Sequence, residues 1–276
     1  MARCVFLIIL AVISGCATTR LSGAELDRVR RPAFISRIEV EAGPRSRVFR
    51  EDDAYEAKLK KLEPKEADRR LQAKLSKAVT RFEVSERLRV STANRLPQEY
   101  PWTNVLDPAR VASVLESFLV EEVPANPPDY DLLAPMGVDA VVEFVVEEYG
   151  MRSDGGHAGA YVKGYGRMFR LAGRQEVWRR SFDADQITAG APHLDPLKVG
   201  KDPELYRQAI TSLLDGVAEQ FAQDLSPKDR RGGPPLPEGP DLSAPDSTNR
   251  TGRENQQRPP KPEPELPAGE LPDPDP

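Results

Sequence analysis

The chain has almost no cysteine and almost no histidine. Only Cys4 and Cys16 occur among its 276 residues, together with two histidines. Cys4 lies in an N-terminal apolar segment that we expect to be removed, and Cys16 follows that segment directly. If Cys16 is modified, the mature chain has no thiol left for a disulfide, a zinc site or a cysteine nucleophile. Three classes of mechanism are thereby excluded.

The N-terminus also lacks an apolar run long enough to cross a membrane as a helix. Its run, Cys4 to Ile13, is ten residues long, whereas a spanning helix needs about 20. Arg3 precedes the run, and small residues separate it from Cys16. A positive start, a short apolar core and a small-residue ending are typical of a secretory signal peptide. We therefore predict that residues 1–15 are a signal peptide.

The end of this segment resembles a bacterial lipobox, in which the cysteine is lipidated on sulfur and becomes the first residue after cleavage. Cys16 is then the predicted lipid anchor, and the alternative is an ordinary signal peptide with an incidental cysteine. Each buried methylene of an acyl chain contributes about 0.8 kcal/mol, so more than one chain gives stable attachment. Ala17 stands where an aspartate would resemble an inner-membrane retention signal. We expect anchoring in the outer membrane, with the protein facing the periplasm and the cell surface as the alternative.

Composition divides the remaining chain into three parts. Residues 16–31 are polar and weakly patterned, which is typical of a flexible tether. Residues 227–276 contain 14 of the chain's 27 prolines and no aromatic residue. This tail is predicted to be disordered, because it cannot bury enough apolar surface to offset its ordering entropy. Residues 32–226 carry the periodic apolar pattern and are predicted to form one domain of ordinary size.

Within the domain, strand-like alternation and helical periodicity follow one another. The charged stretch from Pro44 to Leu62 reads as loop or weak helix. The fold class predicted from this order is α+β, a mainly antiparallel sheet with helices packed on one face. The predicted elements are strands at Phe34–Val40 and Leu88–Thr92, helices beginning near Pro64 and Pro108, a three-stranded meander over Val138–Phe182, and a closing helix at Glu204–Leu225.

The meander predicts one buried and one exposed sheet face. Gly164 and Gly166 admit the close approach of a covering helix. On the opposite face, acids of the first strand should meet bases of the next two strands in exposed cross-strand ion pairs. These residues are Glu143, Glu147, Lys163, Arg167 and Arg179.

These features together resemble a group of bacterial envelope lipoproteins. The group includes the penicillin-binding-protein activator lipoproteins, the curli-secretion lipoproteins and the auxiliary lipoproteins of ABC-type transport systems. The matching residues are the lipobox, the strand at Val138–Val142 and the turn from Gly173 to Trp178. The resemblance covers about Phe34 to Leu225. It implies an α/β sandwich and an envelope setting, and it assigns no functional residue.

Other chemistry has weaker support in the sequence. His157 and His193, with aspartates nearby, suggest a metal or acid–base pair, but they lie more than thirty residues apart in turn and loop sequence. Glu143, Glu147 and Glu148 suggest paired carboxylates, although an ion-paired sheet face explains them equally well. The net charge of −5, without a stripe of aromatic and basic residues, argues against nucleic-acid binding. We expect no cofactor, no metal and no enzymatic activity.

One connection is long enough to suggest a function of its own. Ala184 to Pro203 shows no periodicity, and connections longer than about 12–15 residues are uncommon unless they are functional or disordered. Its mixture of apolar and charged residues is typical of an interaction surface, and a plain structural crossover is the alternative. The predicted docking residues are Ile187, His193, Leu194, Asp195, Leu197 and Lys198.

Two functions remain open on this reasoning. The first is a non-catalytic binding or accessory module that docks on an envelope complex, such as a cell-wall synthase or a transporter. The second is a structural subunit of an oligomeric envelope assembly or secretion pore. A barrel-forming protein needs membrane-crossing strands of about 9–11 residues, and outside the meander the sequence offers none flanked by turn signals. The binding module is therefore preferred.

Overall fold

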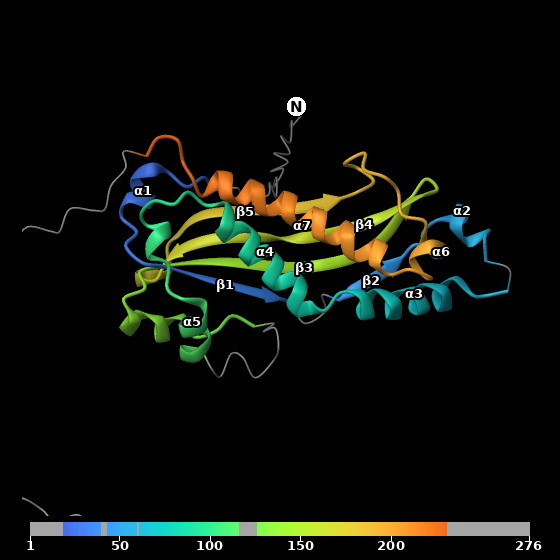
Figure 1. The fold of residues 1–276 in the computed structure, drawn as a ribbon, viewed down its shortest axis with the longest axis horizontal. Coiled ribbons are helices and arrows are strands. Elements are labelled where there is room, and N and C mark those ends of the chain that lie inside the picture. Colours follow the sequence, from blue (N-terminus) through green and yellow to red (C-terminus); the bar gives the residue numbers. More distant parts are fainter. Residues whose placement is uncertain (1–18, 40–42, 60, 116–125, 231–276) are drawn as a thin grey trace, which may run out of the picture. The chain divides into compact units, whose positions relative to one another are not determined.

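The computed structural model of the protein describes residues 19–39, 43–59, 61–115 and 126–230. Helices lie on both sides of one sheet (Figure 1). The strands are β1 (Pro32–Ile38), β2 (Pro44–Arg47), β3 (Ala140–Asp154), β4 (His157–Arg170) and β5 (Glu176–Asp185). The α-helices are α1 (Gly23–Asp27), α2 (Asp53–Glu56), α3 (Pro64–Ala78), α4 (Arg81–Arg95), α5 (Pro108–Val114), α6 (Pro196–Val199) and α7 (Glu204–Asp224). Short 3₁₀ helices are η1 (Trp102–Asn104), η3 (Tyr130–Met136) and η4 (Ala172–Arg174).

The sheet is mixed. Its order is β1-β3-β4-β5, and β2 pairs with the later part of β3, beyond the end of β1. The antiparallel meander β3-β4-β5 confirms the prediction. Both β1 and β2 run parallel to β3, so the expected mainly antiparallel sheet is wrong for the N-terminal strands. Parallel pairing needs a long crossover, and the pattern of β1 alone does not reveal which strand lies beside it.

A helical layer of α3, α4 and α7 covers one face of the sheet (Figure 1). Phe221 of α7 is at its centre: it stacks on Phe144 with ring centroids 5.6 Å apart and meets Trp178 and Phe182 edge-on. A side chain at Gly166 would place its Cβ 2.5 Å from the Trp178 ring. The predicted close approach at this glycine is confirmed, and α7 is the covering helix.

A second, smaller core lies on the other face. There α5 and η3 pack against the start of β1 and β3 and the end of β4. The prediction that helices pack on one face only is therefore wrong at this end of the sheet. The sheet residues of this core occupy the alternate positions to those that face α7: Ala33, Ile35, Val141 and Phe169.

The strand predicted at Leu88–Thr92 is wrong, because these residues lie inside α4. A capping box starts the helix: the Thr80 hydroxyl accepts from the Glu83 amide (3.1 Å), and the Glu83 carboxylate accepts from the Thr80 amide (2.7 Å). Hydroxyl residues fill several buried positions, which hides the helical period from a count of apolar residues. The buried positions of α4 are Val84, Ser85, Leu88, Ser91 and Thr92.

The charged segment before α3, expected to be loop or weak helix, contains β2 and α2. Asp68 of α3 is 4% exposed and holds the end of β2 in place. Its carboxylate accepts hydrogen bonds from the Ser46 hydroxyl (2.5 Å) and from the amides of Val48, Phe49 and Arg50 (2.9, 3.3 and 3.1 Å). Four donors on one buried carboxylate fix a segment whose own sequence has little strand propensity.

The predicted tether, residues 16–31, is too long. Thr19 pairs through its backbone with Arg179 of β5, and the following residues form α1. Leu26 and Val29 are both 0% exposed and belong to the main core. One leucine in a helix of five residues, with Val29 just beyond its end, gives no periodicity that a sequence pattern could detect.

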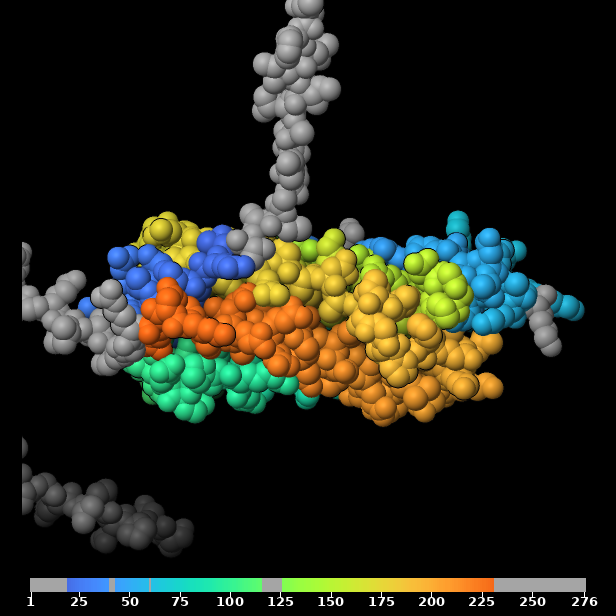
Figure 2. All heavy atoms as spheres, turned by 90° about the horizontal axis from the view of Figure 1, so that it is seen from above, coloured from blue at the N-terminus to red at the C-terminus, as the bar shows by residue number. Residues whose placement is uncertain are grey.

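The predicted start of the tail at residue 227 is also too early. The Asp229 carboxylate accepts from the Gly23 amide (3.1 Å), and Arg230 Nε donates to Asp27 (2.9 Å). These contacts bring the residues after α7 against α1, and both views show α1 beside that end of α7 (Figures 1 and 2). The rest of the predicted tail, 231–276, lies outside the described residues.

Candidate functional site

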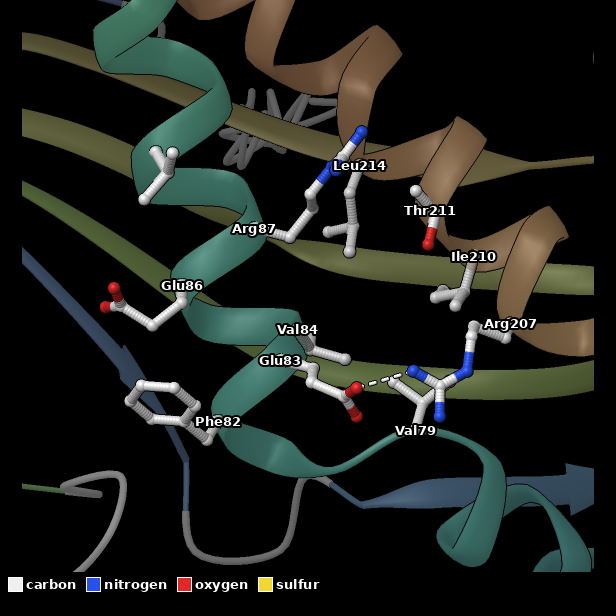
Figure 3. A pocket seen from close by; sticks show the side chains of 11 residues that line it. Val79, Phe82, Glu83, Val84, Glu86, Arg87, Arg207, Ile210, Thr211 and Leu214 are labelled. Atoms are coloured by element: carbon white, nitrogen blue, oxygen red, sulfur yellow. Dashed lines mark hydrogen bonds and ion pairs between the residues drawn. The ribbon is translucent and has the colours of Figure 1, made fainter. Parts of the chain in front are cut away.

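An open groove of about 360 Å³ lies between α4 and α7 on the outer surface of the helical layer (Figure 3). The buried side chains at its floor are all aliphatic: Val79, Val84, Ile210 and Leu214. The more exposed side chains around it are Phe82, Glu83, Glu86, Arg87, Val90, Arg207 and Thr211.

Two large apolar side chains of α4 are exposed at this groove. Phe82 is 47% exposed and Val90 is 40% exposed. They lie eight residues, or two helical turns, apart with Glu86 midway between them, so the three share one stripe of the helix. Figure 3 shows Phe82 and Glu86 on the side of α4 that faces away from α7, whereas Val84 points toward α7. Apolar surface thus continues from the groove floor around α4.

Ion pairs cross from one helix to the other above the floor. Glu83 binds Arg207 at 2.5 Å (Figure 3), and Arg87 binds Asp215 at 2.5 Å. The Ser91 hydroxyl also donates to Asp215 (2.8 Å). The Arg87 guanidinium, helped by Ser91, holds the pKa of Asp215 below its usual value. These contacts fix the separation of the two helices, so the groove is a preformed feature of the surface.

A buried charge network lies on the other sheet face, beside the second core. Glu143 is 0% exposed, and its carboxylate accepts from Arg37 Nε (2.8 Å), the Tyr130 hydroxyl (2.5 Å) and Arg167 Nε (2.5 Å). Arg37 also donates to the Tyr165 hydroxyl (3.0 Å). Burial, together with the Glu143 carboxylate, raises the pKa of Tyr130 far above its usual value.

The predicted pairing of Glu143 with Arg167 is confirmed, but its exposed setting is wrong. Glu143 and Arg167 lie opposite each other in register. The pair is covered because η3 places Tyr130 over it. A bulge between Val146 and Glu148 shifts the register, so that Glu148, and not Glu147, lies opposite Lys163. The network ties β1, β3, β4 and η3 together, which gives Glu143 a structural role. Glu148 pairs instead with Arg47 of β2 (2.5 Å).

The predicted docking connection is only partly a free loop. Its Leu194 amide donates to the Ala158 carbonyl (2.8 Å), and Leu194 packs against the core. Asp195 caps the short helix α6 through the Leu197 amide (2.8 Å). Figures 1 and 2 place the connection beside the tip of the β3–β4 hairpin. Ile187 is half-buried against Gly159.

Four of the six predicted docking residues, His193, Asp195, Leu197 and Lys198, are exposed, and among these Leu197 alone is a large apolar one. Leu197 is 45% exposed, and both His193 and Lys198 are exposed. No contact among the described residues tests whether they bind a partner, so the docking surface stays a prediction.

The fold brings the chain's two histidines together. His157 at the hairpin tip and His193 in the connection stack with ring centroids 4.1 Å apart and planes inclined by 20°. Two imidazoles supply at most two metal ligands. Within the described ranges there is no cluster of three or more histidine, cysteine, aspartate or glutamate side chains able to hold a metal ion. The pairing of these distant histidines had no signal in the sequence.

The predicted lipidation site, Cys16, lies outside the described residues, as does the predicted signal peptide. Among the residues that the structure does describe, no helix has the length and apolar character needed to span a bilayer.

The sequence pattern predicts a strand at Leu88–Thr92, so it gives no indication of a groove beside α4. Once α4 is read as a helix, the exposure of Phe82 has a sequence signal. Val84 and Leu88 define the buried face of α4. Phe82 comes two residues before Val84, which is about 200° of helical rotation, so it lies on nearly the opposite side of the helix. A single exposed apolar residue is ordinary on a helix surface, but Phe82 and Val90 beside one groove together mark a candidate contact surface.

No protein-family model matches the chain, and no curated protein matches it. Several solved structures resemble it at low identity. A hypothetical protein from Chlamydia trachomatis is 12% identical over 70% of this chain and 98% of its own, with a TM-score of 0.30. The PelC dodecamer from Paraburkholderia phytofirmans is 10% identical, and the match covers 77% of this chain and 98% of the PelC chain, with a TM-score of 0.33. A lipoprotein from Neisseria meningitidis is 15% identical, and the match covers 70% of this chain and 99% of the lipoprotein chain, with a TM-score of 0.31. Likenesses of this size carry no argument about what this chain binds.

Proposed function

We propose that the protein is a lipid-anchored, non-catalytic binding module of the bacterial envelope. Cys16 holds it in the outer membrane, and its domain faces the periplasm. The observation that supports a binding role is the apolar groove beside α4, where Phe82 and Val90 remain exposed. Covering the exposed parts of both side chains would contribute about 1–3 kcal/mol, since full burial of each is worth about 1.5–3 kcal/mol.

The occupant that fits this surface is an amphipathic helix of a partner protein. Phe82 and Val90 lie about 12 Å apart along α4, at 1.5 Å per residue. A partner helix therefore needs apolar side chains about two turns apart, the anchor spacing of helix-in-groove recognition.

Charge adds a condition on the partner. Glu86 lies between the two apolar residues, and its ion-pair partner is Arg89 of the same helix (2.5 Å). The carboxylates nearer α7 are instead engaged across the groove, Glu83 by Arg207 and Asp215 by Arg87. Glu86 is therefore the acid that can exchange partners without loosening the two helices. A basic residue between the apolar anchors of the partner helix would meet it.

The test is site-specific photo-cross-linking in envelope membranes, with the photoreactive amino acid at position 82. The matched position is 197, because Leu197 has similar exposure (45%) and lies in the predicted docking connection. We expect position 82 to cross-link to an amphipathic helical peptide of another envelope protein with the spacing described above. The product should be lost in an otherwise folded Val90→Ser variant and weakened by Glu86→Lys.

Other outcomes decide against this proposal. Cross-linking from position 197 alone would move binding to the connection containing His193 and Lys198. A product that joins two copies of this chain would favour the structural subunit of an oligomeric assembly. Capture of segments without helical spacing would show that the groove does not select a helix.

A further inference from the structure

The first backbone pairing among the described residues lies only three residues from the predicted anchor. Thr19 N donates to the Arg179 carbonyl (3.1 Å), and Arg179 N donates to the Thr19 carbonyl (3.0 Å), at the outer edge of β5. Only Ala17 and Thr18 separate Thr19 from Cys16. Three residue steps span at most about 11 Å of fully extended chain. A lipid on Cys16 would therefore hold the edge of β5 next to the bilayer.

The surface beside this contact carries basic side chains. Arg20 and Lys163 are exposed, and neither forms an ion pair with any described residue. Lys163 lies opposite Asp183 in the β4–β5 register, but Arg152 reaches that aspartate (3.7 Å). Arg179 is partly exposed, pairs with Glu176 (3.2 Å) and lies over the Tyr165 ring.

We propose that the edge of β5, with the adjoining sheet face that carries Lys163 and Arg179, lies against the membrane and contacts anionic phospholipid headgroups. This inference rests on the proposed lipidation of Cys16. The short connection limits the distance, and the basic side chains select the orientation. A cation near an anionic bilayer contributes about 1 kcal/mol.

The orientation has a consequence for the groove. Successive residues of a strand point to opposite faces of the sheet. On β5, Trp178 and Phe182 face α7, whereas Arg179 points to the other side. With the Arg179 face against the bilayer, α4 and α7 point away from it. The groove is then open to partners in the periplasm.

The test uses the lipidated full chain in vesicles. Once Cys16 carries lipid and Cys4 is removed, the protein has no other cysteine, so one introduced cysteine gives a unique label. Ser181 on β5 and Ser212 on α7 are both exposed serines on opposite sides of the sheet. Fluorophores on Ser181→Cys and Ser212→Cys are compared for energy transfer to acceptor-labelled headgroups, in vesicles containing phosphatidylglycerol.

We expect much stronger transfer from position 181 than from position 212. Arg20→Gln with Lys163→Gln should reduce the population held at the surface by about fivefold per charge. The control variant Lys74→Gln with Lys77→Gln changes exposed positions on α3. It should leave the contrast, meaning the difference in energy transfer between positions 181 and 212, unchanged. Six glycine and serine residues inserted after Ala17 lengthen the reach by about 20 Å and should also reduce the contrast.

Two failures are distinguishable. If the wild-type protein does not float with vesicles, the anchor itself is wrong, and with it the proposed function. If the protein floats but both labels transfer equally, the anchor stands and the orientation is overturned. An unchanged contrast in the Arg20→Gln, Lys163→Gln variant would also overturn the headgroup contacts.

Discussion

Replacing Glu143 with glutamine should cost more stability than any other single charge neutralisation that we consider. Glu143 is 0% exposed, and two guanidinium groups and one phenol donate to its carboxylate. Glutamine keeps the shape, but it removes the negative charge and turns an NH₂ group toward a donor. Removal of one partner from a buried ion pair costs about 3–5 kcal/mol. At about 2–4 °C per kcal/mol for a domain of this size, the melting temperature should fall by about 6–20 °C.

Thermal and urea unfolding, followed by circular dichroism, measure this loss. The control is Glu147→Gln, since Glu147 is half-buried and forms no ion pair among the described residues; its effect should stay within about 0.5 kcal/mol. Tyr130→Phe should cost less in the Glu143→Gln background than in the wild type, because the charge-assisted hydrogen bond is already gone. Equal stability of Glu143→Gln and Glu147→Gln would refute the structural role assigned to the network.

Three further predictions concern the helical layer and the chain ends. The pKa of Asp215 is lower in the folded protein than in the unfolded chain. Its ion pair therefore stabilises the fold fully at a pH above the unfolded-state pKa of about 3.9, and this stabilisation is lost as the pH falls through the lower pKa of the folded state. Asp215→Asn should cost about 1–2 kcal/mol at pH 7 and flatten the acid dependence of the urea midpoint. Gly166→Ala should destabilise by about 1–3 kcal/mol through overlap with Trp178. By contrast, Gly216→Ala in α7, where nothing lies within 4 Å of the added Cβ, should stabilise by about 0.5–1 kcal/mol, as melting curves would show. A chain ending after Arg230 should keep the wild-type melting temperature, whereas one ending after Ser226 should melt lower, because it loses the Asp229 and Arg230 contacts to α1.

Local patterns predicted the elements whose alternation or period is strong. The meander and α7 have uninterrupted apolar patterns, and proline at the first position marks the starts of α3 and α5. The parallel pairing of β1 with β3 could not be predicted, since it joins segments about 108 residues apart in sequence, as in Pro32 with Ala140. β2 has a polar sequence, and it is held in place because the Asp68 carboxylate accepts hydrogen bonds from the Ser46 hydroxyl and the Val48 amide.

Much of the candidate site depends on tertiary structure. The exposure of Phe82 follows only when α4 is known to be a helix, and Ser91 and Thr92 conceal that helix. The stacking of His157 on His193 arises because the connection before α6 folds back on the hairpin tip. Cys16, by contrast, rests on sequence alone.

The most direct test of the lipid anchor is the mass of the mature N-terminal peptide. The protein is purified from the membrane fraction of its native host or of a Gram-negative expression host, digested and measured by mass spectrometry. A lipid anchor at Cys16 predicts a peptide that begins at that residue and carries acyl chains, together with release or precursor accumulation of Cys16→Ser. A mature protein that retains residues 1–15, or begins elsewhere with an unmodified Cys16, would contradict it.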